Sequence, residues 1–235
     1  MLFDTGPAAL QGPLSRALSW VSWLSKAASI CWLAGMAAAT ASAATNSPDF
    51  GDIVPSADAR YMAQWVLESG DHQGVPFAIV DKKAATLFVF NHTGRLQGAA
   101  TALLGLAPGD HSVADIGQRA VTQILPSERT TPAGRFASEP GHNLQGEDIV
   151  WVDYDAALAI HRLRPAPARE RRPQRLRSKV LGDKRISLGC VIVAVDFYEA
   201  VVAPLLGRQR GVVYVLPETR SVQSMFGKPM QLALQ

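Results

Sequence analysis

The sequence predicts a mainly β domain with short helices, because short apolar segments recur along it and only two stretches have a helical pattern. The segments are rich in Val, Ile and Phe, and clusters of Gly and Pro separate them at near-regular intervals. This spacing is typical of a β-sandwich or barrel with helical additions. The 235 residues suffice for one domain of ordinary size. Hydrophobic residues make up 48% and charged residues 18%, which favours a packed core over general disorder.

The first 43 residues have the pattern of a cleaved export signal. Arg16 and Lys26 precede an apolar run, and Ala41-Ser42-Ala43 supplies small residues where a signal peptidase cuts. The alternative is an uncleaved membrane anchor, but a weakly apolar run of about 18 residues is at the lower limit for spanning ~30 Å of hydrocarbon. We therefore expect cleavage after Ala43, a location in the periplasm or cell envelope, and no stable membrane span afterwards.

The remaining elements follow in chain order. Residues 44–74 form an N-terminal segment in which Ser56 caps a short helix that runs through Leu67. Strands are expected over 77–81, 85–90, 96–106, 149–154, 157–161 and 211–216. Residues 107–148 carry mainly loop signals, a helix is expected over 196–205, and the tail 218–235 has no clear pattern.

Charge is unevenly distributed after residue 43. The segment 162–185 holds ten basic residues against two acidic ones, a net charge of +8, whereas the rest of the chain from residue 44 sums to −6. Pro165, Pro167 and Pro173 interrupt this basic segment, so we expect a loop rather than a long helix. Charge alone would suit a nucleic-acid arm. The segment has no aromatic residue for base stacking, however, and we expect no nucleic-acid partner.

The cysteine content narrows the chemistry. Cleavage would remove Cys31 and leave Cys190 as a solitary thiol, without a resolving partner for disulfide redox chemistry. Neither cysteine stands in a zinc-ligand spacing, so we expect no metal site. The thiol is therefore either buried and inert, or used as a nucleophile.

The residues around Cys190 favour a nucleophile. Gly189 permits a sharp turn, which would leave its N–H and that of Cys190 free to form an oxyanion hole. His161 ends an apolar strand, where it could accept the thiol proton. Beside an imidazolium and several arginines, the pKa of the thiol is expected to be lowered.

These residues resemble the motif of the L,D-transpeptidase (YkuD-type) family. Ile160-His161 followed by Ser187-Leu188-Gly189-Cys190 is similar to its histidine, spacer and Ser/Thr-x-Gly-Cys pattern. Thr131-Pro-Ala-Gly-Arg-Phe136 resembles its Thr-Pro-x-Gly-x-Phe segment, and residues 77–90 resemble its opening strand pair. The resemblance covers roughly residues 75–217. The spacer is longer than usual, and Ile192 stands where Asn or Arg is usual.

The resemblance implies a β-sandwich with an active-site flap, in which 75–217 is the catalytic domain. It implies Cys190 as nucleophile, His161 as base, Ser187 and Gly189 in the site, and substrate contacts from Leu188, Arg162 and Arg185. The reaction would pass through a Cys190 thioester that releases D-alanine from a peptidoglycan tetrapeptide stem, without metal or organic cofactor. The acceptor would be an amine of a second stem, of a wall-linked protein or of a free D-amino acid. Alternatives are an L,D-carboxypeptidase, a hydrolase of cross-links or protein links, and a non-catalytic wall-binding domain.

Overall fold

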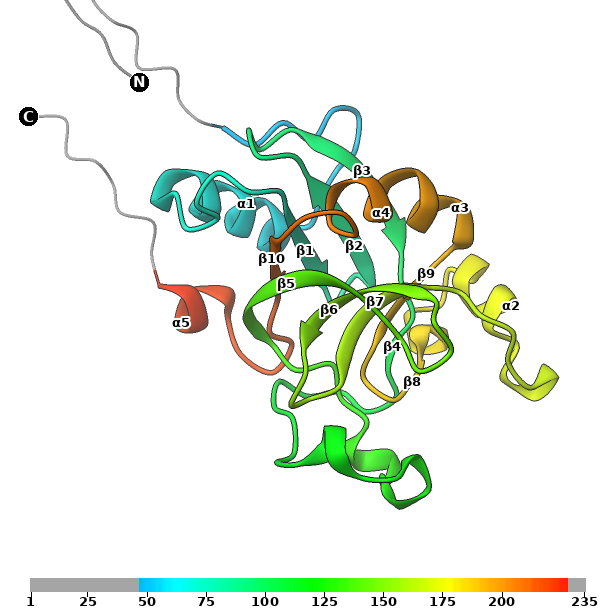
Figure 1. Ribbon diagram of the computed structural model, residues 1–235. Coiled ribbons are helices and arrows are strands. Elements are labelled where there is room, and N and C mark those ends of the chain that lie inside the picture. Colours follow the sequence, from blue (N-terminus) through cyan, green and yellow to red (C-terminus); the bar gives the residue numbers. More distant parts are fainter. Residues whose placement is uncertain (1–46, 228–235) are drawn as a thin grey trace, which may run out of the picture. The chain divides into compact units, whose positions relative to one another are not determined.

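The computed structural model of the protein describes residues 47–227 (Figure 1). The predicted signal peptide, residues 1–43, and the end of the predicted tail, residues 228–235, lie outside the described residues. Among the helices of residues 47–227, none is both long and apolar enough to cross a bilayer.

The described chain is mainly β with short helices, which confirms the predicted fold class. Its large sheet has the strand order β3-β2-β1-β10-β5-β6-β7-β9, and β4 pairs with β8 in a separate small sheet. Within the large sheet, the β1–β10 and β7–β9 pairs are parallel and the other pairs are antiparallel. The bounds are β1 Phe77–Asp81, β2 Thr86–Phe90, β3 Leu96–Thr101, β4 Leu104–Gly105, β5 Gly134–His142, β6 Asp148–Asp153, β7 Leu158–Arg162, β8 Arg185–Ser187, β9 Val191–Val193 and β10 Gly211–Val215.

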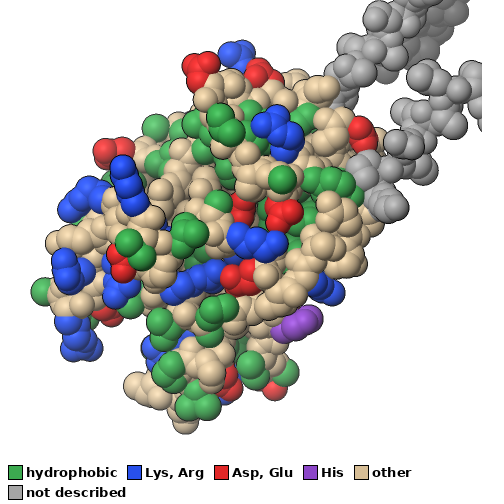
Figure 2. Space-filling model, turned by 180° about the vertical axis from the view of Figure 1, so that it is seen from behind, with side chains coloured by type: hydrophobic (Ala, Val, Ile, Leu, Met, Phe, Trp, Pro, Cys, Tyr) green, Lys and Arg blue, Asp and Glu red, His purple; other side chains and the backbone are tan. Residues whose placement is uncertain are grey.

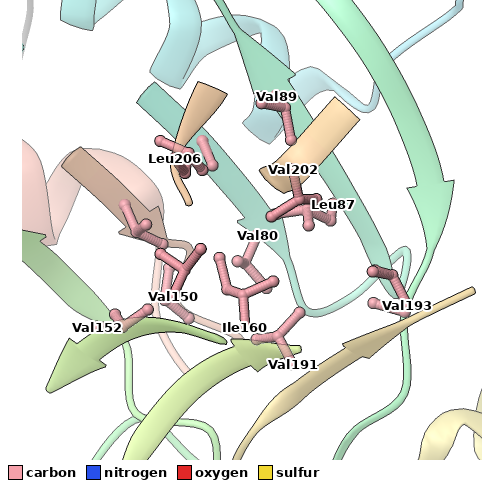
Figure 3. Close-up of a cluster of buried hydrophobic side chains, with 14 of the residues drawn as sticks. Val80, Leu87, Val89, Val150, Val152, Ile160, Val191, Val193, Val202 and Leu206 are labelled. Carbon is pink, nitrogen blue, oxygen red and sulfur yellow. The ribbon is translucent and has the colours of Figure 1, made fainter. Parts of the chain in front are cut away.

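The sheet curls around an apolar interior (Figure 3). Strands from both of its halves contribute alternate residues to one core, including Val80, Leu87, Ile160 and Val191. The end strand β9 also meets the chain just after β3, where Leu103 and Ile192 exchange backbone hydrogen bonds of 2.8 and 2.9 Å. Because these strands enclose this apolar face, its side chains are removed from water, which stabilises the curl.

A helical segment closes this interior. It comprises α3 Val195–Phe197, a π-helical stretch η6 Tyr198–Val202 and α4 Ala203–Leu205, close to the predicted 196–205. Pro204 lies in α4, where its missing N–H and its ring disturb regular α-helical bonding, which fits the neighbouring π-helical stretch. Val202 and Leu206 point from this segment into the core (Figure 3).

The helix α1, Ala57–Ser69, covers the outer face of β1, β2 and β10 (Figure 1). Ser56 caps it as predicted, because its Oγ accepts the Ala59 N–H at 3.0 Å. Met62 and Val66 are buried against this face of the sheet. The predicted N-terminal segment therefore forms a second apolar cluster with the outer face of these strands.

Two expectations about loops were incomplete. Residues 134–142, expected as loop, form the central strand β5. The turn-forming Pro140 is tolerated there because residues 134–138 pair with β10 and residues 139–142 with β6, so Pro140 has a neighbour on one side. The unpatterned tail contains the short helix α5 Val222–Phe226, whose cap is Ser221.

A buried ion pair fixes the long 106–131 segment to the sheet. Lys82, directly after β1, is fully buried, and its Nζ lies 2.8 Å from Asp110 Oδ1. Asp110 also accepts the backbone N–H groups of Glu218 at 2.8 Å and Thr219 at 3.0 Å. The Lys82 ammonium and these hydrogen bonds hold the pKa of Asp110 well below its usual range, although burial opposes them.

We predict that Asp110→Ala lowers the free energy of unfolding by about 3 kcal/mol, because it removes the nearer carboxylate from the buried Lys82 ammonium and leaves only Glu218, 3.5 Å away. Chemical denaturation at pH 7 measures this loss. The wild-type protein should lose the contribution as the pH falls below about 4, through the depressed pKa of Asp110. Asp58→Ala is the control, since Asp58 pairs with Lys83 at the surface. Equal losses in both variants would contradict the prediction.

Candidate active site

The outer face of β6, β7 and β9 carries the predicted nucleophile and base. Side chains alternate along each strand, and Ile160 and Val191 point into the core. Since β7 and β9 pair in parallel with Ile160 opposite Val191, the neighbouring Cys190 and His161 belong to the other face. The structure thus brings these two predicted residues to one face of adjacent strands, two positions apart in register.

The loop before Cys190 is held by its own hydrogen bonds. Ser187 Oγ donates to the Cys190 carbonyl at 2.7 Å and accepts the Gly189 N–H at 3.1 Å. Gly189 has a φ of +150°, and a Cβ there would stand 2.8 Å from the Thr130 carbonyl oxygen. The expectation that the Gly189 N–H is free for an oxyanion was wrong, because the Ser187 hydroxyl occupies it. Ser187 therefore shapes the loop.

The Thr131 hydroxyl holds this loop in place through two hydrogen bonds. Its Oγ1 donates to the Gly189 carbonyl at 2.7 Å and accepts the Gly105 N–H at 2.8 Å. Thr131 is fully buried, so both hydrogen bonds are shielded from water. The sequence indicated this residue through its Thr-Pro-x-Gly-x-Phe segment, but its contacts are visible only in the fold.

The thiol and the imidazole each have a backbone partner. Cys190 Sγ lies 3.5 Å from the Ala157 carbonyl oxygen, in the turn before β7. His161 Nδ1 lies 2.8 Å from the Arg162 carbonyl oxygen, which can only accept, so Nδ1 carries the proton and Nε2 is the basic nitrogen. Within residues 47–227, no hydrogen bond joins the two side chains.

Desolvation favours the neutral form of both groups. Desolvation raises the pKa of the Cys190 thiol above its ordinary value, although the Ala159 N–H, Arg164 and Arg172 oppose this. Desolvation also lowers the pKa of His161 to about 4, helped by the same two arginines and opposed by its bond to Arg162. The expectation of a lowered thiol pKa was therefore wrong for this structure, since desolvation outweighs the nearby positive charge.

Arg164 and Arg172 are the arginines whose charge reaches the thiol and the imidazole. Each also has a carboxylate partner: Arg164 Nε lies 2.8 Å from Glu147 and Arg172 Nε 2.5 Å from Glu170. These ion pairs reduce the net positive field at Cys190.

The three residues predicted to contact the substrate do not lie together at the thiol. The Arg162 guanidinium lies over the Tyr198 ring, 5.7 Å from its centroid, on the core side of β7. Arg185 pairs with Glu218 and donates to the Lys82 carbonyl at 3.3 Å, so it belongs to the buried ion cluster. Leu188 is exposed beside the cysteine loop. Of the three, Leu188 alone is free to meet a ligand at the thiol.

The basic segment is partly ordered by its own charges. It contains η4 Ala168–Glu170, α2 Arg172–Arg177 and η5 Leu181–Lys184, in place of the featureless loop expected. Lys184 is buried, and its Nζ donates to the last carbonyls of α2 and to Ser178. The exposed cations of this segment gather on one side of the molecule (Figure 2), and include Arg169, Arg171, Arg177 and Lys179.

Ile192, at the position where the resembling family has a polar residue, is 1% exposed. Its backbone hydrogen bonds to Leu103 tie the middle of β9 to the residue just before β4. An apolar side chain suits this buried place, and it offers a substrate no hydrogen bond. Among the described residues, no cluster of His, Cys, Asp and Glu could hold a metal ion.

Comparison with known proteins gives structural matches alone. No protein-family model and no curated protein matches the chain. Solved structures do match, among them the LD transpeptidase LdtMt1 in complex with imipenem and an L,D-transpeptidase from Mycobacterium smegmatis. Both neighbours are L,D-transpeptidases.

Both are 16% identical to this chain and are matched over 60% of it. The TM-score is 0.35 for the first, over 59% of that chain, and 0.34 for the second, over 58% of that chain. The present chain thus spans about three fifths of the length of each neighbour.

We predict that Thr131→Val destabilises the cysteine loop. The substitution keeps the volume but leaves the Gly105 N–H and the Gly189 carbonyl buried without a partner, which costs about 1–3 kcal/mol each. Denaturation gives the loss of stability, and hydrogen exchange at the amides of 187–190 locates it. Thr131→Ser should restore protection at these amides. Equal exchange in the Val variant and the wild type would show that the Thr131 hydroxyl does not hold the loop.

We also predict how iodoacetamide labelling of Cys190 depends on pH. Because the pKa of the thiol is raised and that of His161 is about 4, the rate should climb through pH 9 without an inflection near pH 6.5. Mass spectrometry of the intact protein measures the rate, and His161→Ala should leave this profile unchanged in shape. A rate plateau reached below pH 7 would instead indicate a resting thiolate–imidazolium pair.

Proposed function

We propose that the protein is a peptidoglycan L,D-transpeptidase that uses Cys190 as its nucleophile. The observation that carries the proposal is the placement of Cys190 and His161 on one face of the paired strands β7 and β9. The Ser-Leu-Gly-Cys and Thr-Pro-Ala-Gly-Arg-Phe segments support it, because Thr131 of the second holds Gly189 of the first.

The first half-reaction forms a thioester. With a neutral thiol and a neutral imidazole at rest, the Cys190 proton must move to His161 Nε2 as Sγ attacks the carbonyl that precedes the terminal D-alanine of a tetrapeptide stem. Before this, Sγ turns away from the Ala157 carbonyl toward His161. The carbon–nitrogen bond then breaks, the imidazolium returns the proton to the leaving amine, and D-alanine departs.

The second half-reaction transfers the acyl group. An amine of a second stem, of a wall-linked protein or of a free D-amino acid attacks the thioester carbonyl, while His161 removes the proton of the amine. The carbon–sulfur bond breaks and the thiol is restored. Attack by water in place of the amine would make the same site an L,D-carboxypeptidase.

The remaining assignments complete the proposal. Residues 75–217 would form the catalytic domain, with α1 and α5 packed on its outer side, and the 106–131 segment would serve as its flap. This segment reaches the turn before β7, where the Gly117 N–H donates to the Asp155 carbonyl at 3.1 Å. Cleavage after Ala43 would deliver the domain to the periplasm or cell envelope, where its substrate lies.

We predict that Cys190→Ala and Cys190→Ser each lower D-alanine release from a tetrapeptide stem by several orders of magnitude, because the covalent nucleophile is lost. Released D-alanine and cross-linked products are measured by mass spectrometry. The fold should persist, since the variants keep the backbone bonds of the loop.

Carbapenem exposure gives a direct second measurement. The wild type should gain the mass of one carbapenem, and Cys190→Ala should gain none. Cys31→Ala is the matched control, because it removes the other cysteine and should still be acylated once. D-alanine release by folded Cys190→Ala would contradict the proposal. An unlabelled and inactive wild type would favour a non-catalytic wall-binding domain.

A further inference from the structure

A pocket opens where β5 changes its partner. Residues 134–138 of β5 pair with β10, and residues 139–142 pair with β6, so the sheet forks between these two strands. A pocket of about 360 Å³ lies at this fork, and its walls include Glu139, Trp151, Tyr154 and Arg210. None of its lining residues belongs to the buried ion cluster or to the basic segment 162–185.

Two aromatic rings form the apolar wall of the pocket. Trp151 and Tyr154 are stacked, with ring centroids 4.6 Å apart and planes inclined by 28°. Gly141 leaves room for the indole, because a Cβ there would stand 2.4 Å from Trp151 Cδ1. Tyr154 is nevertheless 58% exposed. An aromatic pair left open to solvent is a common feature of ligand sites.

The turn that carries Tyr154 is rigid. Asp153 Oδ1 accepts the N–H groups of Asp155 at 2.9 Å and Ala156 at 3.2 Å. The Ala157 N–H donates to the Tyr154 carbonyl at 3.1 Å. Because the backbone on both sides of Tyr154 is bonded, the aromatic surface is organised before a ligand arrives, which lowers the entropic cost of binding.

Charged groups stand at the edge of the aromatic wall. Arg210 and Glu139 lie 3.9 Å apart, and their side chains are 85% and 41% exposed. At this distance and exposure they remain available to a ligand as a donor and an acceptor.

A flat apolar face with donors and acceptors around it matches the chemistry of a pyranose sugar. One face of such a ring presents C–H groups that pack on an aromatic ring, and its edge presents hydroxyls that bond to carboxylate and guanidinium groups. A purely apolar ligand would leave Arg210 and Glu139 without a role. A short acidic peptide would meet the Glu139 carboxylate.

We propose that this pocket is a saccharide-binding site. It lies in register with the thiol, since Glu139 pairs with Trp151, Trp151 with Ala159, and Ala159 adjoins Cys190 across the sheet. Adjacent strands are about 4.8 Å apart, so the Trp151 and Cys190 backbones are separated by roughly 10 Å. The site would hold the glycan strand while an attached stem reaches the thiol. That last step rests on the proposed function, whereas saccharide binding does not.

The test is a titration of the full chain with the trisaccharide of N-acetylglucosamine, followed through the tryptophan indole N–H signals. The Trp151 signal, assigned with Trp151→Phe, should shift in a saturable way with a dissociation constant on the order of 1 mM. Tyr154→Ala should weaken binding about tenfold or more, because half of the aromatic wall is removed. Leu125→Ala should bind as the wild type, since Leu125 is equally exposed, at 60%, and lies outside the pocket.

The same titration on Cys190→Ala separates this inference from the proposed function. If the Cys190→Ala variant and the wild type both bind the trisaccharide, the pocket assignment stands. If the wild type also proves inactive toward a tetrapeptide stem, that inactivity contradicts the proposed transpeptidase and leaves the pocket assignment unchanged. The saccharide site is overturned if the Trp151 signal does not shift, if a free tetrapeptide stem shifts it and the trisaccharide does not, or if Tyr154→Ala binds as tightly as the wild type.

Discussion

The hydroxyl of Thr131 joins three segments that are distant in the sequence, and the cysteine loop depends on it. It bonds to Gly105 at the end of β4 and to Gly189 beside Cys190. The Thr131 carbonyl in turn accepts the Lys82 ammonium at 2.9 Å, and Lys82 is paired with Asp110. A continuous set of buried polar contacts therefore runs from the end of β1 to the thiol. Each member is shielded from water, so loss of one leaves the others without compensation.

The electrostatics of the site follow from burial more than from net charge. The basic segment carries +8, yet the two arginines that influence Cys190 are each paired with a glutamate. Desolvation then decides the protonation state, and both the thiol and the imidazole rest in their neutral forms. Under the proposed function, proton transfer would accompany nucleophilic attack, and the thiol would not be reactive in the absence of substrate. Such a thiol is also protected from adventitious oxidation.

The sequence was sufficient for most strands, because alternating or continuous apolar runs bounded by turns identify them. It was insufficient for β5, where Pro140 and two glycines mask a strand that changes partner midway. In the site, alternation along β7 places Arg162 on the face opposite to that of His161. The same alternation gives no reason to expect Arg164 near the imidazole, so that contact follows from the course of the chain after β7. The Arg185–Glu218 pair joins residues 33 positions apart, and no local pattern predicts such a contact.

The turn between β6 and β7 links the thiol to the aromatic pocket. Its Ala157 carbonyl contacts Cys190 Sγ at 3.5 Å, and its Tyr154 forms the pocket wall. Asp153 and Gly117 fix this turn through hydrogen bonds of 2.9–3.2 Å, whereas the contact of the thiol with the Ala157 carbonyl is 3.5 Å long. Under the proposed function, the Cys190 side chain would rotate when the thiol approaches His161, because it loses the weaker bond. The turn would stay fixed during that rotation, and a ligand on Tyr154 would keep its position relative to the reacting carbonyl.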